Sequence, residues 1–154
     1  MKLYTGMTVT ISLPPEPTKV EVFAGEEIQK YLTKIFGQVT FAETAPLTVI
    51  IGDPARNELA KTVISEEEYA EKVSGPEGFL YQVKDNTLLL AGNGTGNLYA
   101  VYEFLEREMG CCFGAFPLPQ VPAGEIVPNL TEKDLSHMLQ YKAEADLPYR
   151  MACV

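Results

Sequence analysis

The strongest constraint on the fold is an abrupt change from a strand pattern to a helix pattern in residues 88–110, LLLAGNGTGNLYAVYEFLEREMG. An apolar run leads into three glycines at alternate positions, and a helical pattern follows at once and stops at Gly110. The apolar run is the second half of a hairpin, because Asp85 and Asn86 separate it from a similar run and both tolerate a positive φ. A hairpin at this place excludes a regular alternation of strand and helix, and with it a simple dinucleotide-binding sheet.

Other patterns predict a second long helix and further strands. Thr18 and Glu21 form a capping box that begins this helix, and Gly37 ends it. Residues 47–52 are apolar on both faces, which is typical of a buried central strand. More strands are predicted at 7–13, 39–43 and 138–143, a short strand or a turn at 111–116, and a short helix at 65–72. We therefore predict an α+β fold, a two-layer sandwich in which the two main helices cover one face of a mixed β-sheet.

The three glycines in residues 92–96 raise the question of a phosphate-binding loop. A Walker loop is excluded, because no lysine follows the glycines at the position it needs. The dinucleotide fingerprint requires a third glycine where Asn97 stands, since that glycine lets helix and strand pack closely. We predict instead a strand-to-helix turn with Asn93 or Thr95 as the N-cap, and no bound cofactor.

The charge of the chain argues against two classes of partner. The 154 residues carry a formal net charge of −9, with 12 Lys and Arg against 21 Asp and Glu. This balance excludes a duplex nucleic-acid binder and disfavours an anionic membrane surface. No apolar run approaches the roughly 20 residues of a transmembrane helix, and the first residues lack the pattern of a signal peptide. The compartment stays open between the bacterial periplasm, secretion and the cytoplasm.

The three cysteines, Cys111, Cys112 and Cys153, are expected to be buried free thiols. Their number is odd, and a bridge between the neighbours Cys111 and Cys112 would be strained. The chain has no C-x-x-C pair, and its one histidine, His137, is not part of an H-E-x-x-H motif. No metal site is therefore predicted.

Three segments together carry a family pattern: the helix VFAGEEIQKYLTKIFG, the strand LTVIIGDP and, most specifically, residues 77–117, EGFLYQVKDNTLLLAGNGTGNLYAVYEFLEREMGCCFGAFP. They resemble the small domain that precedes the catalytic barrel in α-glucuronidases and their relatives. The resemblance covers residues 8–128 and departs from the family pattern at Gly114, where the family has an aromatic residue. The same fold precedes the barrel in family 20 β-N-acetylhexosaminidases, so the resemblance implies a hexosaminidase N-terminal-domain-like sandwich.

The resemblance also implies that this sandwich has no catalytic centre of its own, since the acid/base carboxylates of such enzymes lie on the (β/α)₈ barrel that follows. Residues 1–130 are predicted to be the non-catalytic N-terminal domain. Residues 131–154 are predicted to be a linker and the start of the barrel, which needs at least about 200 residues. Arg150 resembles the arginine of the P-x-R motif in family 20 enzymes, which contacts the sugar, and is the candidate substrate-binding residue.

The sequence leaves three hypotheses for the function of this chain. The leading hypothesis is an accessory domain of a carbohydrate-active enzyme, with the C-terminal barrel of the same polypeptide as its partner. It predicts an exposed apolar patch at 117–128 or beyond residue 138. The alternative, a stand-alone carbohydrate-binding module, would need a row of exposed aromatic residues, whereas most aromatics here fall at core positions. A small independent enzyme could use Glu103 and Glu106, although acids at this spacing are ordinary on a solvated helix face.

Overall fold

The structure is a computed structural model, and it describes residues 1–114 and 124–144. The first half contains β1 (Lys2–Tyr4), β2 (Thr8–Ser12), α1 (Lys19–Phe36), β3 (Thr40–Phe41), β4 (Leu47–Ile51), the 3₁₀ helix η1 (Glu58–Thr62) and α2 (Glu66–Lys72). The second half contains β5 (Phe79–Lys84), β6 (Thr87–Gly92), α3 (Gly96–Arg107), β7 (Cys112–Gly114), β8 (Gly124–Ile126), β9 (Glu132–Asp134) and β10 (Gln140–Ala143). Both long helices and the β5–β6 hairpin lie where the sequence predicts them.

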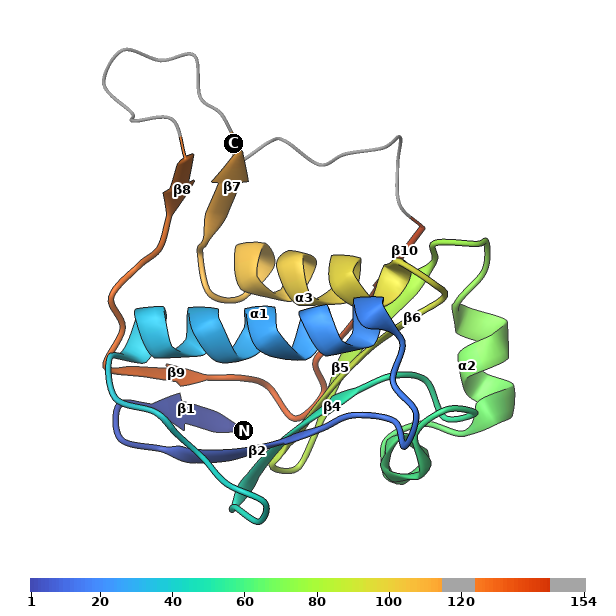
Figure 1. Ribbon diagram of the computed structural model, residues 1–154, viewed down its shortest axis with the longest axis horizontal. Helices are drawn as coiled ribbons and strands as arrows, with labels where there is room; N and C mark the ends of the chain where they lie inside the picture. The colour runs from blue at the N-terminus through green and yellow to red at the C-terminus, as the bar shows by residue number, and fades with distance from the viewer. Residues whose placement is uncertain (115–123, 145–154) are drawn as a thin grey trace.

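Six of the described strands form one mixed sheet in the order β10-β5-β6-β4-β2-β3. Strands β2, β3, β4 and β6 run parallel to one another. Strand β5 is antiparallel to both of its neighbours, β6 and β10. Two further sheets have two strands each: β1 pairs with β9, and β7 pairs with β8 (Figure 1). Strand β4 lies between β6 and β2, which agrees with the apolar pattern that predicted a central strand.

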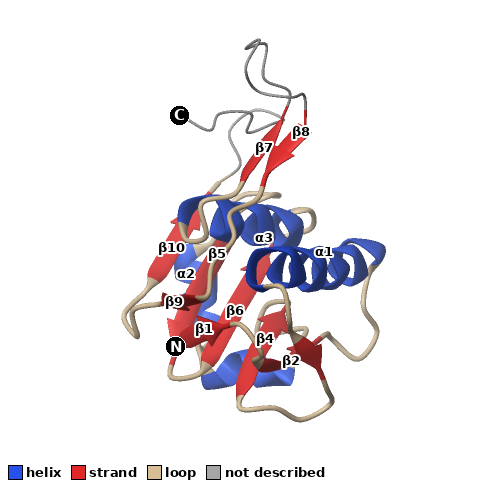
Figure 2. Cartoon of the chain, turned by 90° about the vertical axis from the view of Figure 1, so that its left-hand side faces the viewer, coloured by secondary structure: helices blue, strands red, loops and turns tan. Residues whose placement is uncertain are grey.

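Helices α1 and α3 lie side by side on one face of the sheet (Figure 2). Alternate strand residues point at them, and together they form the main core of the protein. Its largest fully buried side chains include Ile28, Leu32, Phe79, Tyr81 and Phe104. The predicted α+β sandwich, with two main helices on one face of a mixed sheet, is confirmed.

Local capping explains where α1 begins and ends. The Thr18 side chain accepts a hydrogen bond from the Glu21 N–H at 3.2 Å, and the Thr18 N–H donates to Glu21 Oε2 at 2.8 Å. Both halves of the predicted capping box are therefore present, and they satisfy backbone groups that a helix start otherwise leaves without partners. Gly37 ends the helix with a φ of 80°, a conformation that favours glycine.

The opposite face of the sheet is partly covered by η1 and α2, which form a second, smaller core. Ile50 points to this face, whereas its neighbours Val49 and Ile51 point to α1 and α3. The second core consists of Ile50, Ala60, Val63, Ile64, Tyr69, Val73, Leu80, Leu89 and Ala91. The sequence predicts the short helix α2 but not its position, because its pattern is too short to indicate which face of the sheet it covers.

The sheets continue past residue 130, where the sequence placed the end of the domain. Strand β9 pairs with β1, and β10 pairs with β5. The predicted strand at 138–143 is thus present as β10. Residues 132–143 complete sheets that begin in the first 130 residues, so in the structure they are part of the same fold. Short strands with exposed residues carry a weak sequence pattern, so their pairing with β1 and β5 is not visible in the sequence.

Strand β10 is held to the main core by Tyr141. Its ring stacks on Tyr81 with a centroid separation of 5.3 Å and lies 6.3 Å from the ring of Phe79. On the other side, the guanidinium carbon of Arg107 lies 4.2 Å from the ring centroid, a cation–π distance. The edge strand is therefore fixed by an aromatic side chain between β5 and α3.

Replacement of Tyr141 by alanine is expected to lower the free energy of unfolding by about 2 kcal/mol, because the stacking and the cation–π contact are both lost. Amide hydrogen exchange in β10 should become faster at the same time. Lys142→Ala is the matched control, since Lys142 lies on the same strand and is exposed. Equal exchange rates in the two variants would contradict the assigned role of Tyr141.

Candidate functional site

The glycine turn between β6 and α3 is shaped by close backbone packing. A Cβ atom on Gly92 would lie 2.2 Å from the carbonyl carbon of Gly96. A Cβ atom on Gly96 would lie 2.3 Å from the carbonyl oxygen of Gly78, and one on Gly78 would lie 2.0 Å from that of Ser74. Three glycines are therefore needed so that the chain before β5 can cross the start of α3 in direct backbone contact.

The polar groups of this turn bond to other parts of the same chain. The Gly92 N–H donates to Asn97 Oδ1 at 3.1 Å, and the Asn93 N–H donates to the Gly78 carbonyl at 2.8 Å. The Asn93 side chain accepts from the Tyr69 hydroxyl and donates to the Gly75 carbonyl. These bonds connect the turn to the segment before β5 and to α2, and they give the Gly92 and Asn93 amides partners within the protein.

The predicted N-cap of α3 is only half correct. Thr95 occupies the N-cap position, but its side chain makes no capping bond and its hydroxyl donates to Glu77 Oε1 at 2.9 Å instead. The Asn97 side chain also bonds to the turn, since its Nδ2 donates to the Gly94 carbonyl at 3.1 Å. The difference arises because Glu77, which precedes β5, lies beside the turn in the folded chain, and sequence spacing does not show this.

The described residues contain neither a metal-binding cluster nor a membrane-spanning helix. No group of three or more His, Cys, Asp or Glu side chains in residues 1–114 and 124–144 is arranged to hold a metal ion. Within the same described ranges, no helix has the length and apolar character needed to cross a membrane.

The carboxylates on α3 differ from expectation. Glu103 has only 4% of its surface exposed and lies 4.0 Å from Arg107 Nη1. Glu106 is half-buried. The prediction that this face of α3 is solvated is therefore wrong for Glu103.

The candidate site is the ribbon base, where the two-stranded β7–β8 ribbon meets the long helices before it extends away from them (Figure 1). It consists of Tyr31, Lys34, Tyr102, Phe113 and Glu125. Glu125 of β8 accepts hydrogen bonds from the Tyr31 hydroxyl and from Lys34 Nζ, the latter at 2.6 Å. Both donors belong to α1. Phe113, which pairs with Glu125 across the ribbon, lies 5.0 Å from the ring of Tyr31 and 5.2 Å from that of Tyr102. These contacts fix the ribbon to both long helices.

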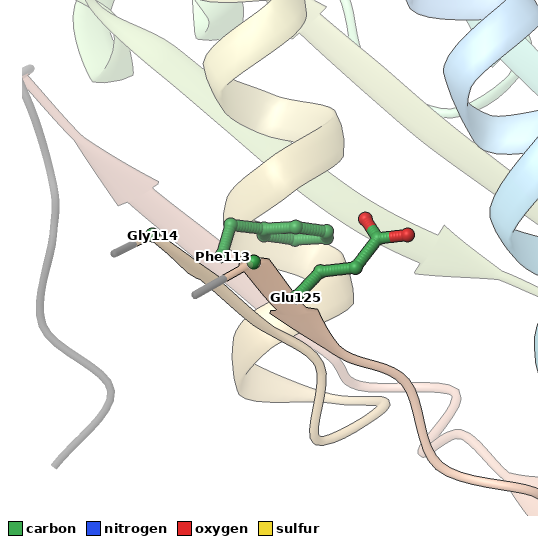
Figure 3. A pocket seen from close by; sticks show the side chains of 4 residues that line it. Phe113, Gly114 and Glu125 are labelled. Carbon is green, nitrogen blue, oxygen red and sulfur yellow. The ribbon is translucent and has the colours of Figure 1, made fainter. Parts of the chain in front are cut away.

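An open cavity of about 380 Å³ lies beside these contacts. It is lined by Phe113, Gly114, Gly124 and Glu125, all of which belong to the ribbon. Figure 3 shows the Phe113 ring and the Glu125 side chain next to each other at this place. Gly114 and Gly124 are paired with each other across the ribbon.

The charges at the ribbon base stabilise one another. Burial by itself would raise the pKa of Glu125, but the hydrogen bonds from Lys34 and Tyr31 outweigh it and hold the pKa below its usual value of 4.5. The pKa of Tyr31 is raised by burial and by the Glu125 carboxylate, which accepts a hydrogen bond from its hydroxyl. Tyr31 is therefore a neutral hydrogen-bond donor to an ionised Glu125.

Glu125→Gln is expected to lower the free energy of unfolding by at most about 1 kcal/mol at neutral pH, since the pair is partly exposed to solvent. The pKa of Glu125 is depressed in the folded state, so this contribution is present above the unfolded pKa and is lost as the pH falls below about 4.5. Urea unfolding at pH 7 and pH 3 measures it. The control Glu132→Gln removes a more exposed pair with Lys2, and an equal loss in both variants would contradict the anchoring role of Glu125.

Two expectations concern segments that are only partly described. Ile126 is 47% exposed and Met138 is 78% exposed, and each lies in or at the edge of a segment where an apolar patch is predicted. Residues 117–123 lie outside the described residues. Arg150, the candidate substrate-binding residue, also lies outside them, so the structure places no side chain that corresponds to this prediction.

The cysteines differ from the sequence-based expectation in one respect. Cys111 is buried and is not part of a disulfide, as predicted. Cys112 is disulfide-bonded, so the prediction of a free thiol is wrong at this position. Cys153 lies outside the described residues.

The sequence did not single out the residues of the ribbon base. Tyr31 and Lys34 stand on a regular amphipathic helix, where such residues are ordinary, and Glu125 stands in a Pro- and Gly-rich segment without a strand pattern. The pairing of Phe113 with Glu125 depends on a connection across residues 115–123. No local signal could have indicated it.

The architecture places the chain in the class of mixed-sheet α+β sandwiches. No family model matches the sequence, and no curated protein does. Among solved structures, the chain is similar to a family GH115 4-O-methyl-α-glucuronidase with specificity for decorated arabinogalactans, at 14% sequence identity and a TM-score of 0.65. The similarity covers 92% of this chain and 18% of that chain. The protein therefore shares the fold of a small part of a glycoside hydrolase.

Proposed function

We propose that this chain is a non-catalytic N-terminal accessory domain of a carbohydrate-active enzyme of the α-glucuronidase type. One observation carries the proposal: nearly the whole chain has the fold of less than a fifth of a family GH115 enzyme. A unit that accounts for so small a share of an enzyme is expected to support the rest of it. The chemistry would belong to a catalytic barrel elsewhere in the same polypeptide.

Within this proposal, the sheets formed by residues 1–143 pack on the barrel, and the segment with Arg150 leads into its first strand. The fold relationship to the N-terminal domain of family 20 β-N-acetylhexosaminidases is part of the same proposal. It rests on the sequence resemblance of residues 8–128.

An activity assay of this chain by itself tests the proposal. Purified protein should release no uronic acid from glucuronoxylan or decorated arabinogalactan, and no amino sugar from chitooligosaccharides, above a heat-denatured control. Robust hydrolysis of any of these substrates by this chain would overturn the proposal. The coding sequence supplies an independent test, since a reading frame that continues past Val154 should encode a barrel with two acid/base carboxylates.

Titration calorimetry separates this function from a stand-alone carbohydrate-binding module. Such a module needs exposed aromatic platforms, and among the described residues the exposed large aromatics are Tyr4 and Phe23, on β1 and α1. We expect no heat of binding with glucuronoxylan, arabinogalactan or chitin oligosaccharides. Saturable heat with any of them would support the module instead.

A further inference from the structure

The outer face of α1 is exposed over most of the helix. The inner face packs on the sheet through Ile28 and Leu32, and α3 lies along one flank (Figure 2). On the outer face Phe23 is 43% exposed, and among the described residues no other large apolar side chain of α1 or α3 is exposed. An open hollow of about 500 Å³ lies further along the same face. It is lined by Glu26, Gln29, Lys30, Thr33 and Lys34.

The charges of this outer face are complementary to those of the same face turned end to end. Glu26 stands two residues before the inward-facing Ile28, and Lys30 stands two residues after it. If two α1 helices pack antiparallel about a two-fold axis at the level of Ile28, Glu26 of each copy is level with Lys30 of the other. The same register brings Phe23 level with Thr33, at the hollow of the other copy.

The charges also limit the register and the kind of partner. A two-fold axis at the level of Lys30 would place the two Lys30 side chains together, and like charges repel at such a contact. A partner surface with one sign of charge would be repelled either by Glu26 or by Lys30. A second copy turned end to end offers the opposite charge at both positions.

The Lys30 ammonium group is already ordered for such a contact. Its Nζ lies 3.1 Å from Glu27 Oε1 and 4.7 Å from the centroid of the Tyr31 ring, and the side chain is still 48% exposed. Glu27 is only 6% exposed and accepts a hydrogen bond from the Tyr102 hydroxyl at 3.1 Å. Because a fixed carboxylate holds the lysine, little side-chain entropy is lost when a second carboxylate approaches it.

We propose that two copies of this chain associate through the outer faces of α1, antiparallel, with Glu26 of each copy opposite Lys30 of the other. The 18 residues of α1 span about 27 Å, so this face by itself is smaller than the roughly 800 Å² per partner of a standard interface. The association is therefore weak, reversible and dependent on concentration. The proposal does not depend on the proposed function.

Sedimentation equilibrium of the purified chain over a range of concentrations tests the proposal. We expect a monomer–dimer equilibrium that is about tenfold weaker in Lys30→Glu and in Glu26→Lys, because each change places like charges together twice. The double variant Glu26→Lys/Lys30→Glu should recover the dimer, since it restores opposite charges at both contacts. Phe23→Ala should also weaken the dimer. Lys142→Glu is the matched control, because it changes the net charge as Lys30→Glu does, at an exposed residue of β10.

Folding is checked by thermal unfolding of each variant. Glu26 and Phe23 are exposed, so Glu26→Lys and Phe23→Ala should melt as the wild-type protein does. A chain that is monomeric at every concentration, or a dimer that both single charge changes leave intact, would overturn the proposal. A double variant that does not recover the dimer would overturn it too. Equal weakening in Lys142→Glu would assign the effect to net charge and would likewise exclude this face of α1.

Discussion

Replacement of Gly96 by alanine is expected to destabilise the protein by about 3 kcal/mol or more. Gly96 is the first residue of α3, and in a helix alanine is normally preferred over glycine by about 1 kcal/mol. Here the added Cβ would lie 2.3 Å from the carbonyl oxygen of Gly78 and 3.1 Å from that of Glu77. Both atoms belong to the backbone, so the clash can be relieved only by moving the segment before β5 away from the start of α3.

Gly6→Ala is the matched control for this effect. Gly6 has a φ of 90°, which disfavours alanine, but an added Cβ would meet no atom within 4 Å. Backbone strain alone is expected to cost about 1 kcal/mol at Gly6. Urea unfolding curves of the two variants measure the difference. A Gly96→Ala protein as stable as the Gly6→Ala protein would show that the close approach of the two backbones is not essential.

The second large effect is expected at Glu21, whose carboxylate joins two segments of the chain. Only 1% of its surface is exposed. Its oxygens accept hydrogen bonds from the Thr18 N–H and from Arg56, where Nη2 lies 2.8 Å from Oε2. The start of α1 is thereby connected to the loop that precedes η1. Glu21→Gln places an NH₂ group against these donors and should lower the free energy of unfolding by about 2 kcal/mol.

The same carboxylate should make the protein sensitive to acid. Burial alone would raise the pKa of Glu21, but the hydrogen bonds from Arg56 and Thr18 outweigh it and hold the pKa below its usual value of 4.5. Because the folded state lowers this pKa, the stabilisation is complete above the unfolded pKa and is lost as the pH falls through the folded one.

Urea unfolding between pH 7 and pH 2.5 checks this dependence. The wild-type protein should lose stability below about pH 4.5, and Glu21→Gln should lose less over the same range. Glu58→Gln is the control, since Glu58 is 85% exposed and pairs only with Lys61 at the surface. If the pH dependence of Glu21→Gln equalled that of the wild-type protein, the Glu21–Arg56 pair would not be the source of the acid sensitivity.

Features that depend on neighbouring residues could be predicted from the sequence. The capping box of Thr18 and Glu21 and the hairpin turn at Asp85, with its φ of 53°, are both present. The predicted strand-to-helix turn after residue 92 is also present, between β6 and α3. Such signals are readable because the interacting groups are three or four residues apart, so the spacing itself fixes the geometry.

The candidate site and the place of the last strands were not predictable in this way. The ribbon base brings Glu125 to Tyr31, residues 94 positions apart in the chain. Strand β10 joins the main sheet beside β5, where its Tyr141 ring stacks on Tyr81. These contacts depend on which strands become neighbours, and several pairings are compatible with one pattern of short, polar strands.

By itself, the sequence determined the type of fold, the positions of the long helices and the hairpin, and the absence of a nucleotide-binding glycine pattern, because these follow from local periodicity and turn chemistry. The reason why Gly92 and Gly96 must be glycines is visible only in the tertiary structure. Gly92 and Gly96 crowd each other at the turn, and Gly96 meets the backbone at Gly78, which precedes the other strand of the hairpin. That approach is set by the packing of α3 on β5 and β6, and no spacing along the chain encodes it.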